Sequence, residues 1–283
     1  MALPSVSLAS QARQTAITSR EHQPARSRAL VRSLLYWLAS LALGVVVLGV
    51  WQLLAQLHIA PAFVLPAPFD VVQAFRAAFA DGTLINATGS TLTESGLGFL
   101  LGIAVALPLG YVIAHSRVMA RLLEPYLAMS QALPAVALAP LLVLWLGYGL
   151  LPIVMLCALI VFFPVTIGTI LGLTTVDREV LDAASVDGAT GWSKLWFIET
   201  PLALPSILAG IRAGLTYSIT GAVVGEFVVS AQGLGGLLMI ARGNFDTPLV
   251  FAALIALAVL AALMYGLGKL IELLTRYLEL EVR

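Results

Sequence analysis

Residues 150–172 read LLPIVMLCALIVFFPVTIGTILG, a run without a single charged side chain. A helix needs about 20 apolar residues to cross the hydrocarbon core of a bilayer, so this stretch predicts a membrane-spanning helix. Membrane β-barrel strands are instead short segments of about ten alternating residues. We therefore expect an all-α polytopic membrane protein, a bundle of six transmembrane helices, with the other five near 34–57, 92–114, 126–146, 206–230 and 248–273.

The composition of the whole chain agrees with this expectation. Of 283 residues, 60% are hydrophobic and 11% are charged, whereas an average soluble domain carries about 25% charged residues. A soluble protein with so few charges has too little polar surface to cover that much apolar side chain. The composition therefore excludes a cytosolic enzyme, a nucleic-acid-binding protein and a disordered chain. It indicates an integral membrane protein.

The basic residues predict the orientation of the chain. Twelve Lys and Arg residues lie on the side of both termini, two lie on the other side, and Arg212 lies within a predicted span. Because basic residues favour the cytoplasmic side, we expect a multi-pass protein with both termini in the cytoplasm. Residues 1–33, rich in Ser, Ala, Gln and Arg, are expected to form a flexible cytoplasmic tail, and residues 34–283 the transmembrane domain.

Two further patterns concern the packing and the outer surface. The outer connection 58–91 predicts an amphipathic surface helix from Val71 to Phe79 that ends at Asp81-Gly82. Glycines four residues apart within spans allow two helices to approach closely. Such pairs are Gly98/Gly102, Gly168/Gly172, Gly210/Gly214 and Gly221/Gly225.

Among the inner connections, residues 173–205 form the longest, and this stretch predicts two short helices at a sharp elbow. Asp177 is suited to cap a helix over 178–187, and Gly188 is suited to end it. Thr190 is suited to cap a second helix, which we expect to stop before Pro201. Small side chains on the first helix, beside one carboxylate, would let a partner protein approach closely.

The spacing in this connection resembles the EAA loop of importer-type ABC transporter permeases. The pattern comprises Asp182-Ala183-Ala184, then Gly188, Ile198 and Pro201. Over about residues 60–280, further segments resemble the branch of that family that imports nitrate, sulfonates, taurine and vitamin precursors. These segments are Pro134-x2-Ala137-x2-Pro140, Trp145-x-Gly147-x-Gly149, Phe162-Phe163-Pro164 and Gly233-Leu234-Gly235. The chain departs from the family pattern at Asp182 (usually Glu), Thr200 (usually Leu) and Glu94 (often Arg).

The resemblance implies a type I ABC importer permease of the bacterial inner membrane, without catalytic residues or a metal site. ATP and Mg²⁺ would bind separate ATPase subunits, a solute-binding protein would deliver the solute, and a second permease copy would complete the pathway. The solutes that it implies are nitrate, taurine, alkanesulfonates, a thiamine-related pyrimidine and riboflavin. Residues implied in ATPase coupling are Asp182, Ala183, Ala184, Asp187, Gly188, Ile198 and Pro201.

Charged residues within spans mark a second group of candidates. Intramembrane charge is costly and often indicates a transport pathway, although snorkelling or an interhelical pair also explains it. Glu94, Arg212 and Glu226 are therefore candidates for either role. The glycine-rich segment 231–238, which contains Gly233 and Gly235, is expected to be a flexible outer loop, whereas the family resemblance implies a gate or a contact for an external binding protein.

Other functional classes find less support in the sequence. Its histidines (His22, His58 and His115) lie outside or at the edges of the predicted spans, and no Gly-x-Ser-x-Gly motif is present for an intramembrane hydrolase. No phosphate-binding Gly-x4-Gly-Lys-Ser/Thr motif occurs either, so this chain is not expected to hydrolyse ATP. An ion-coupled secondary transporter, with Glu94 and Glu226 as titrating groups, remains an alternative.

Overall fold

The computed structural model describes residues 24–57, 59, 61, 63–131, 134–229 and 232–281, and in those ranges every regular element is helical. The chain divides into two units, Met1–Pro68 and Phe69–Arg283. The first contains α2 (Pro24–Gln56), where the Trp51 indole N–H donates to the Pro66 carbonyl at 3.0 Å. Residues 24–33, expected to belong to the tail, form the first turns of α2, and the rest of that tail lies outside the described residues.

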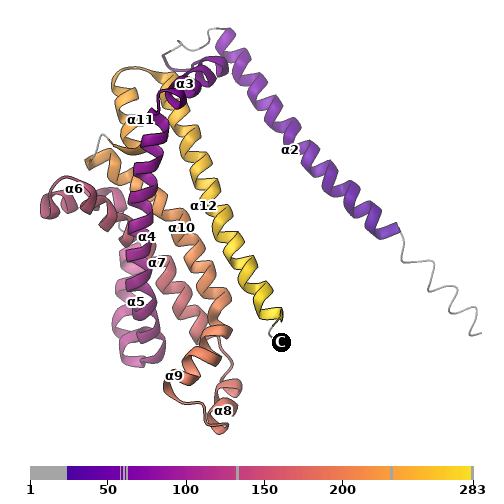
Figure 1. The fold of residues 1–283 in the computed structure, drawn as a ribbon, viewed down its shortest axis with the longest axis vertical. Coiled ribbons are helices and arrows are strands. Elements are labelled where there is room, and N and C mark those ends of the chain that lie inside the picture. The colour runs from indigo at the N-terminus through magenta and orange to yellow at the C-terminus, as the bar shows by residue number, and fades with distance from the viewer. Residues whose placement is uncertain are drawn as a thin grey trace, which may run out of the picture. The chain divides into compact units, whose positions relative to one another are not determined.

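The second unit is a helical bundle (Figure 1). Within the described ranges of the chain, five helical segments are long and apolar enough to cross a membrane: Leu38–Gln56, Thr83–His115, Leu150–Thr174, Gly191–Val229 and Thr247–Thr275. The expected helix from Val71 to Phe79 is present within α3, and its position on a membrane surface stays a prediction. From α3 onward the elements are α3 (Pro68–Ala80), α4 (Thr83–His115), α5 (Arg117–Gln131), α6 (Ala135–Leu146), α7 (Leu150–Thr174), α8 (Arg178–Val186), α9 (Gly191–Lys194), η1 (Leu195–Glu199), α10 (Thr200–Val229), α11 (Gly233–Gly243) and α12 (Thr247–Glu281).

Helix α7 packs closely against α4 and α10 through the predicted glycine pairs. On α4, Gly98 faces Cys157 of α7 and Gly102 faces Val161, so these two helices run parallel. On α10, Gly210 faces Gly168 of α7, and the other glycines of the predicted pairs also meet backbone or side-chain atoms of the facing helix. The prediction that these glycines allow close helix packing is confirmed for all four pairs.

The helix directions define two ends of the bundle. At one end, called the elbow end because α8 and α9 form the predicted elbow there, α4 and α7 finish at His115 and Thr174, and α8 and α9 lie below them (Figure 1). At the far end, α4 and α7 begin at Thr83 and Leu150, and α10 finishes at Val229.

The predicted span at 126–146 is wrong as a single helix, because the chain there is divided between α5 and α6. Their 15 and 12 residues rise about 22 and 18 Å, each less than the roughly 30 Å core of a bilayer. Pro134 precedes α6 and cannot continue the α5 hydrogen-bond ladder. Since α4 and α7 run parallel, α5 and α6 together return the chain from the elbow end to the far end.

Helix α4 begins at Thr83, nine residues before the predicted span. Its first turns contain many hydroxyl residues, whose low hydropathy concealed the helix. The Thr88 and Thr93 hydroxyls donate to the Leu84 and Gly89 carbonyls of the same helix. These bonds pair the hydroxyl hydrogens within α4. The Thr83 backbone N–H donates to Asp81 Oδ1 at 2.8 Å, and this contact lowers the pKa of Asp81.

We expect Gly98→Ala to destabilise the bundle. A Cβ atom at Gly98 would lie 2.8 Å from the Val154 carbonyl oxygen, so α4 and α7 would have to separate. Overpacking of this kind typically costs about 1–3 kcal/mol, which a lowered melting temperature of the purified protein would report. Gly96→Ala is the matched control, because no atom lies within 4 Å of its Cβ position. Equal melting temperatures for the two variants would contradict the prediction.

Candidate functional site

The elbow, residues 177–200, begins with α8, whose two ends are fixed as the sequence predicts. Asp177 Oδ1 accepts from the Glu179 N–H at 2.9 Å and caps the N-terminus of α8. At the other end, Gly188 has a φ of 90° and its N–H donates to the Ser185 carbonyl, while the Ala189 N–H donates to the Ala184 carbonyl. This pair of bonds is a Schellman motif, which needs a left-handed residue and therefore favours glycine.

The second arm of the elbow differs from the prediction. Thr190 does precede α9, although its side chain makes no capping bond. The helix does not stop before Pro201, because α9 continues through the π-helical turn η1 directly into α10. In η1 the backbone bonds span one additional residue, as in the Thr200 N–H to Leu195 carbonyl bond. Pro201 follows this register change in the first turn of α10, where a residue without an N–H is tolerated.

Most of the predicted coupling residues are accessible on the elbow. Asp182, Ala183, Asp187, Gly188 and Pro201 are exposed, while Ala184 and Ile198 are half-buried. The two arms are joined by Lys194, whose Nζ donates to Ser185 Oγ at 3.1 Å. The exposed carboxylate and small side chains of α8 therefore lie on a surface that a partner can reach.

Large apolar side chains on the elbow were not singled out from the sequence. Val186, Trp192 and Phe197 are 87%, 74% and 79% exposed, and Trp196 is 61% exposed. Burying these side chains against another protein would be favourable, because apolar surface is unfavourable in water. The signal that could have revealed them was a cluster of aromatic residues between polar ones in a connection outside the membrane.

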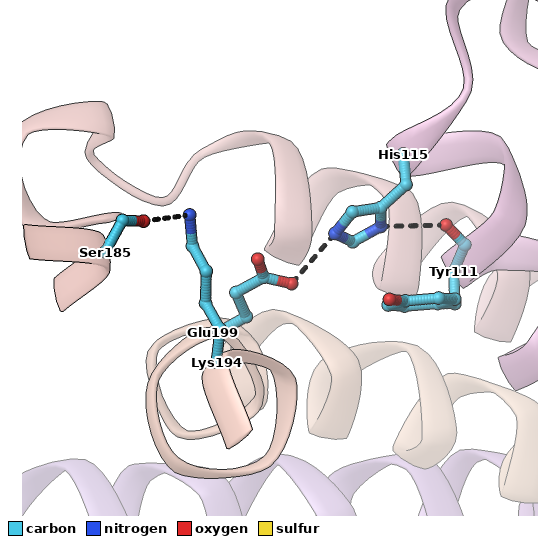
Figure 2. A network of polar contacts seen from close by, with 5 residues as sticks. All are labelled: Tyr111, His115, Ser185, Lys194 and Glu199. Atoms are coloured by element: carbon cyan, nitrogen blue, oxygen red, sulfur yellow. Dashed lines mark hydrogen bonds and ion pairs between the residues drawn. The ribbon is translucent and has the colours of Figure 1, made fainter. Parts of the chain in front are cut away.

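A polar contact joins the elbow to α4. His115 Nε2, at the end of α4, lies 2.8 Å from Glu199 Oε2 in η1 (Figure 2). The other ring nitrogen, Nδ1, lies 3.0 Å from the Tyr111 carbonyl, and the Tyr111 ring packs beside the imidazole at 4.2 Å. Glu199 is buried whereas the His115 side chain is 38% exposed, so this contact links α4 to η1 at the edge of the bundle. The sequence predicted neither residue to have this role.

At the far end, the Glu226 carboxylate caps the N-terminus of α11. The Gly235 backbone N–H donates to Glu226 Oε2, and Thr91 Oγ1 of α4 donates to Glu226 Oε1 at 2.6 Å. Thr91 Oγ1 also accepts from the Leu234 N–H at 2.9 Å. Helix N-termini carry unpaired N–H groups and favour negative charge. This arrangement explains how a carboxylate that is only 1% exposed is stabilised inside the bundle.

At the start of α11, glycine is required at 233 and 235 because both positions lie against the Glu226 side chain. A Cβ atom at Gly233 or Gly235 would collide with the Glu226 side chain, and Gly233 also has a φ of 84°. Gly233 to Leu238 lie in α11, and Gly233 to Leu237 are buried. The interpretation of these residues as a flexible loop is therefore wrong, whereas Ala231 lies outside the described residues.

The two other intramembrane charges have different surroundings. Arg212 pairs with Glu272 of α12 and lies over the Tyr265 ring at 5.8 Å, so it forms an interhelical ion pair. Glu94 lies beside Glu226 and is 5% exposed, and its Oε2 has no hydrogen-bond partner in the described part of the chain. Among those residues, no group of three or more His, Cys, Asp or Glu side chains could hold a metal ion.

Comparisons with known proteins find a family, sequence relatives and a shared fold. Residues 98–277 match the family described as binding-protein-dependent transport system inner membrane component. The chain is similar to the riboflavin transport system permease protein of Chloroflexus aurantiacus (45% identity, 80% of this chain and 85% of the relative). It is also similar to a putative aliphatic sulfonates transport permease protein of Bacillus subtilis (34% identity, 83% and 86%). Inward-facing structures of the methionine ABC transporter MetNI share the fold, with a TM-score of 0.60 at 18% identity over 68% of this chain and 95% of the other.

Thr91→Val should loosen the attachment of α11 to α4. The variant removes the donor to Glu226 and leaves the buried Leu234 N–H without an acceptor, which typically costs about 1–3 kcal/mol. We expect a lower melting temperature and faster proteolysis after Gln232. Thr88→Val is the control, since the Thr88 hydroxyl donates to the Leu84 carbonyl of its own helix. Unchanged stability of Thr91→Val relative to this control would refute the capping role.

Proposed function

The chain belongs to the family of binding-protein-dependent transport system inner membrane components and is a permease of an ABC importer, and we propose that its elbow docks the ATPase subunits. This membership leaves no support for an ion-coupled secondary transporter. The observation that carries the proposal is the exposure of Val186, Trp192 and Phe197 on a short helical projection. Such side chains are stabilised when a partner groove covers them, and the Asp182 carboxylate beside them offers a charge for pairing.

Charge supports a cytoplasmic position for the elbow end. Arg117, Arg121, Arg178 and Lys194 lie at or near that end, and basic residues favour the cytoplasmic side of a membrane. ATP is a cytoplasmic solute, so the elbow is on the side where an ATPase works. ATP and Mg²⁺ then bind the ATPase subunits, while the far end of the bundle faces the solute-binding protein.

Two physical connections carry elbow movement into the bundle. The helix from Gly191 to Val229 is continuous, so displacement of the elbow moves α10 as one body. The His115–Glu199 contact joins the same segment to the end of α4. ATP-driven closure of the ATPases would therefore act on both helices that hold the Thr91–Glu226 contact at the far end.

We assign the outer gate of the pathway to the junction of α4, α10 and α11. Glu226 holds Gly235 and Thr91 together there, and a change in the angle between α4 and α10 would break the Thr91–Glu226 bond. The pathway itself is completed by a second copy of this chain. Glu94 lies beside the gate, whereas Arg212 holds α10 to α12 nearer the elbow end. The solute belongs to the range that spans the riboflavin and sulfonate importers.

Asp182→Arg and Gly188→Trp should each abolish co-purification of the ATPase subunits. The first reverses a charge on the docking surface, and the second places a bulky side chain where the backbone is left-handed and the surroundings are open. Asp70→Arg on α3 makes the same charge change on an exposed residue away from the elbow, and Gly188→Asn is compatible with the left-handed backbone. Full ATPase retention in both elbow variants would reject the docking proposal.

His115→Ala and Glu199→Gln should separate ATP hydrolysis from transport. The ATPase subunits remain bound, because the docking surface is intact, but movement of η1 is no longer passed to α4 through the His115–Glu199 contact. Uptake per ATP hydrolysed in proteoliposomes is expected to fall by about fivefold or more. A fivefold change corresponds to about 1 kcal/mol, the lower end of typical coupling free energies. Lys194→Met serves as the comparison, since it alters the link between the elbow arms and leaves the His115–Glu199 pair in place. If both variants kept the wild-type ratio of uptake to hydrolysis, this route of transmission would be wrong.

A further inference from the structure

A cavity of about 740 Å³ lies at the far end of the bundle, between α4, the start of α7 and Gln232. Its volume is within the range of roughly 300–1,000 Å³ that is typical of sites for small organic ligands. The cavity is much larger than a nitrate ion requires. Its place beside the proposed outer gate, with Glu94 in its lining, connects it to the transport pathway.

One face of α4 supplies most of the polar lining. Asn86, Ser90 and Thr93 follow one another at helical spacing on this face, with Gly89 between them. Asn86 and Thr93 are exposed, and no atom lies within 4 Å of the Cβ position of Gly89. The Ser90 and Thr93 hydroxyls donate to carbonyls of their own helix and keep free lone pairs, and Asn86 adds a side-chain amide, so water or a polar solute is a favourable covering for this face.

Glu94 provides an unused hydrogen-bonding group in this lining. The side chain is 5% exposed, and its Oε2 has no partner among the described residues. Neighbouring Glu226 differs, because Thr91 and Gly235 occupy its two oxygens. Buried polar atoms are nearly always hydrogen-bonded, and an unpaired one costs about 1–3 kcal/mol. A ligand that pairs with Glu94 Oε2 would remove this cost.

The charge of the lining restricts the class of ligand. Glu94 is the single ionisable side chain among the described residues that line the cavity, and no Lys or Arg is present there. A nitrate or sulfonate group would meet a carboxyl group without a compensating cation. Arg212 does not supply that cation, since it is paired with Glu272. By contrast, N–H and O–H groups of an uncharged solute complement the carboxyl and hydroxyl groups of the lining.

We propose that this cavity binds the solute on its way through the importer, and that it accepts an uncharged heterocyclic or polyhydroxyl solute in preference to a free anion. Glu94 Oε2 forms a hydrogen bond with a polar group of that solute, and Asn86, Ser90 and Thr93 bind its remaining polar groups. This inference rests on the proposed function as a permease and narrows its solute from the range of the relatives to one chemical class.

The charge preference is tested with thiol reagents on the full importer in membrane vesicles. Ser90→Cys and Thr93→Cys place a thiol in the cavity, and Thr88→Cys places one on another face of the same helix. Native Cys157 is fully buried. We expect both cavity thiols to react with hydrophilic methanethiosulfonates, while the Thr88→Cys thiol does not. After normalisation to a free thiol, the sulfonate reagent should react no faster than the trimethylammonium reagent, because no Lys or Arg lines the described part of the cavity.

The solute class is tested on the same thiols with riboflavin and an aliphatic sulfonate as probes. Riboflavin is expected to slow labelling of Thr93→Cys at least several-fold, while the sulfonate has no effect. The proposal is overturned if the cavity thiols are unreactive, if the anionic reagent is preferred, if the sulfonate alone protects, or if neither probe protects. ATPase co-purification from the same membranes is measured separately, so its loss would indicate failure of the proposed function rather than of the cavity assignment.

A cavity-filling variant gives a second, independent measurement. Gly89→Leu fills the site, and Gly96→Leu is its control on the same helix, because both Cβ positions are open and Gly96 is outside the lining. Gly89→Leu should reduce ATP-driven uptake of riboflavin at least tenfold with normal ATPase co-purification, and Gly96→Leu should not. Equal uptake in the two variants would show that the cavity is not on the solute's route.

Discussion

Close backbone approach along α7 is the constraint on which the rest of the bundle depends. Glycines on α4, α7 and α10 bring these helices together so tightly that a Cβ atom at Gly98, Gly168 or Gly210 would contact the opposite backbone. In a membrane, lipid competes equally well for apolar side chains, so such packing is a main source of helix association. It fixes the register of three helices, and the polar contacts at both ends of the bundle follow from that register.

At each end, the fixed register brings together residues that are far apart in sequence. Thr91 meets Glu226 at the far end, and His115 meets Glu199 at the elbow end. Both pairs join α4 to the continuous helical segment that runs from the elbow through α10. The same two segments are therefore joined near the proposed ATPase site and near the proposed outer gate, which gives movement at one end a direct mechanical route to the other.

The intramembrane charges divide into structural and unsatisfied groups. Glu226 is stabilised by the N-terminus of α11, and Arg212 is stabilised by Glu272, so both are explained by packing between helices. Glu94 retains an oxygen without a partner among the described residues, and it faces a polar cavity. A buried polar group that the fold does not satisfy is expected where a ligand binds, because the ligand then completes its hydrogen bonds.

Local sequence determined much of this protein. Uncharged runs identified the spanning helices, glycine spacing identified the close contacts, and Asp177 and Gly188 set the ends of α8, because each depends on neighbouring residues along one chain. Tertiary structure alone decided that η1 carries the elbow into α10 past Pro201, that Glu226 caps α11, and that Glu94 Oε2 has no hydrogen-bond partner among the described residues. Those outcomes depend on which distant groups the packed helices bring within hydrogen-bond distance, and spacing along the sequence does not contain that information.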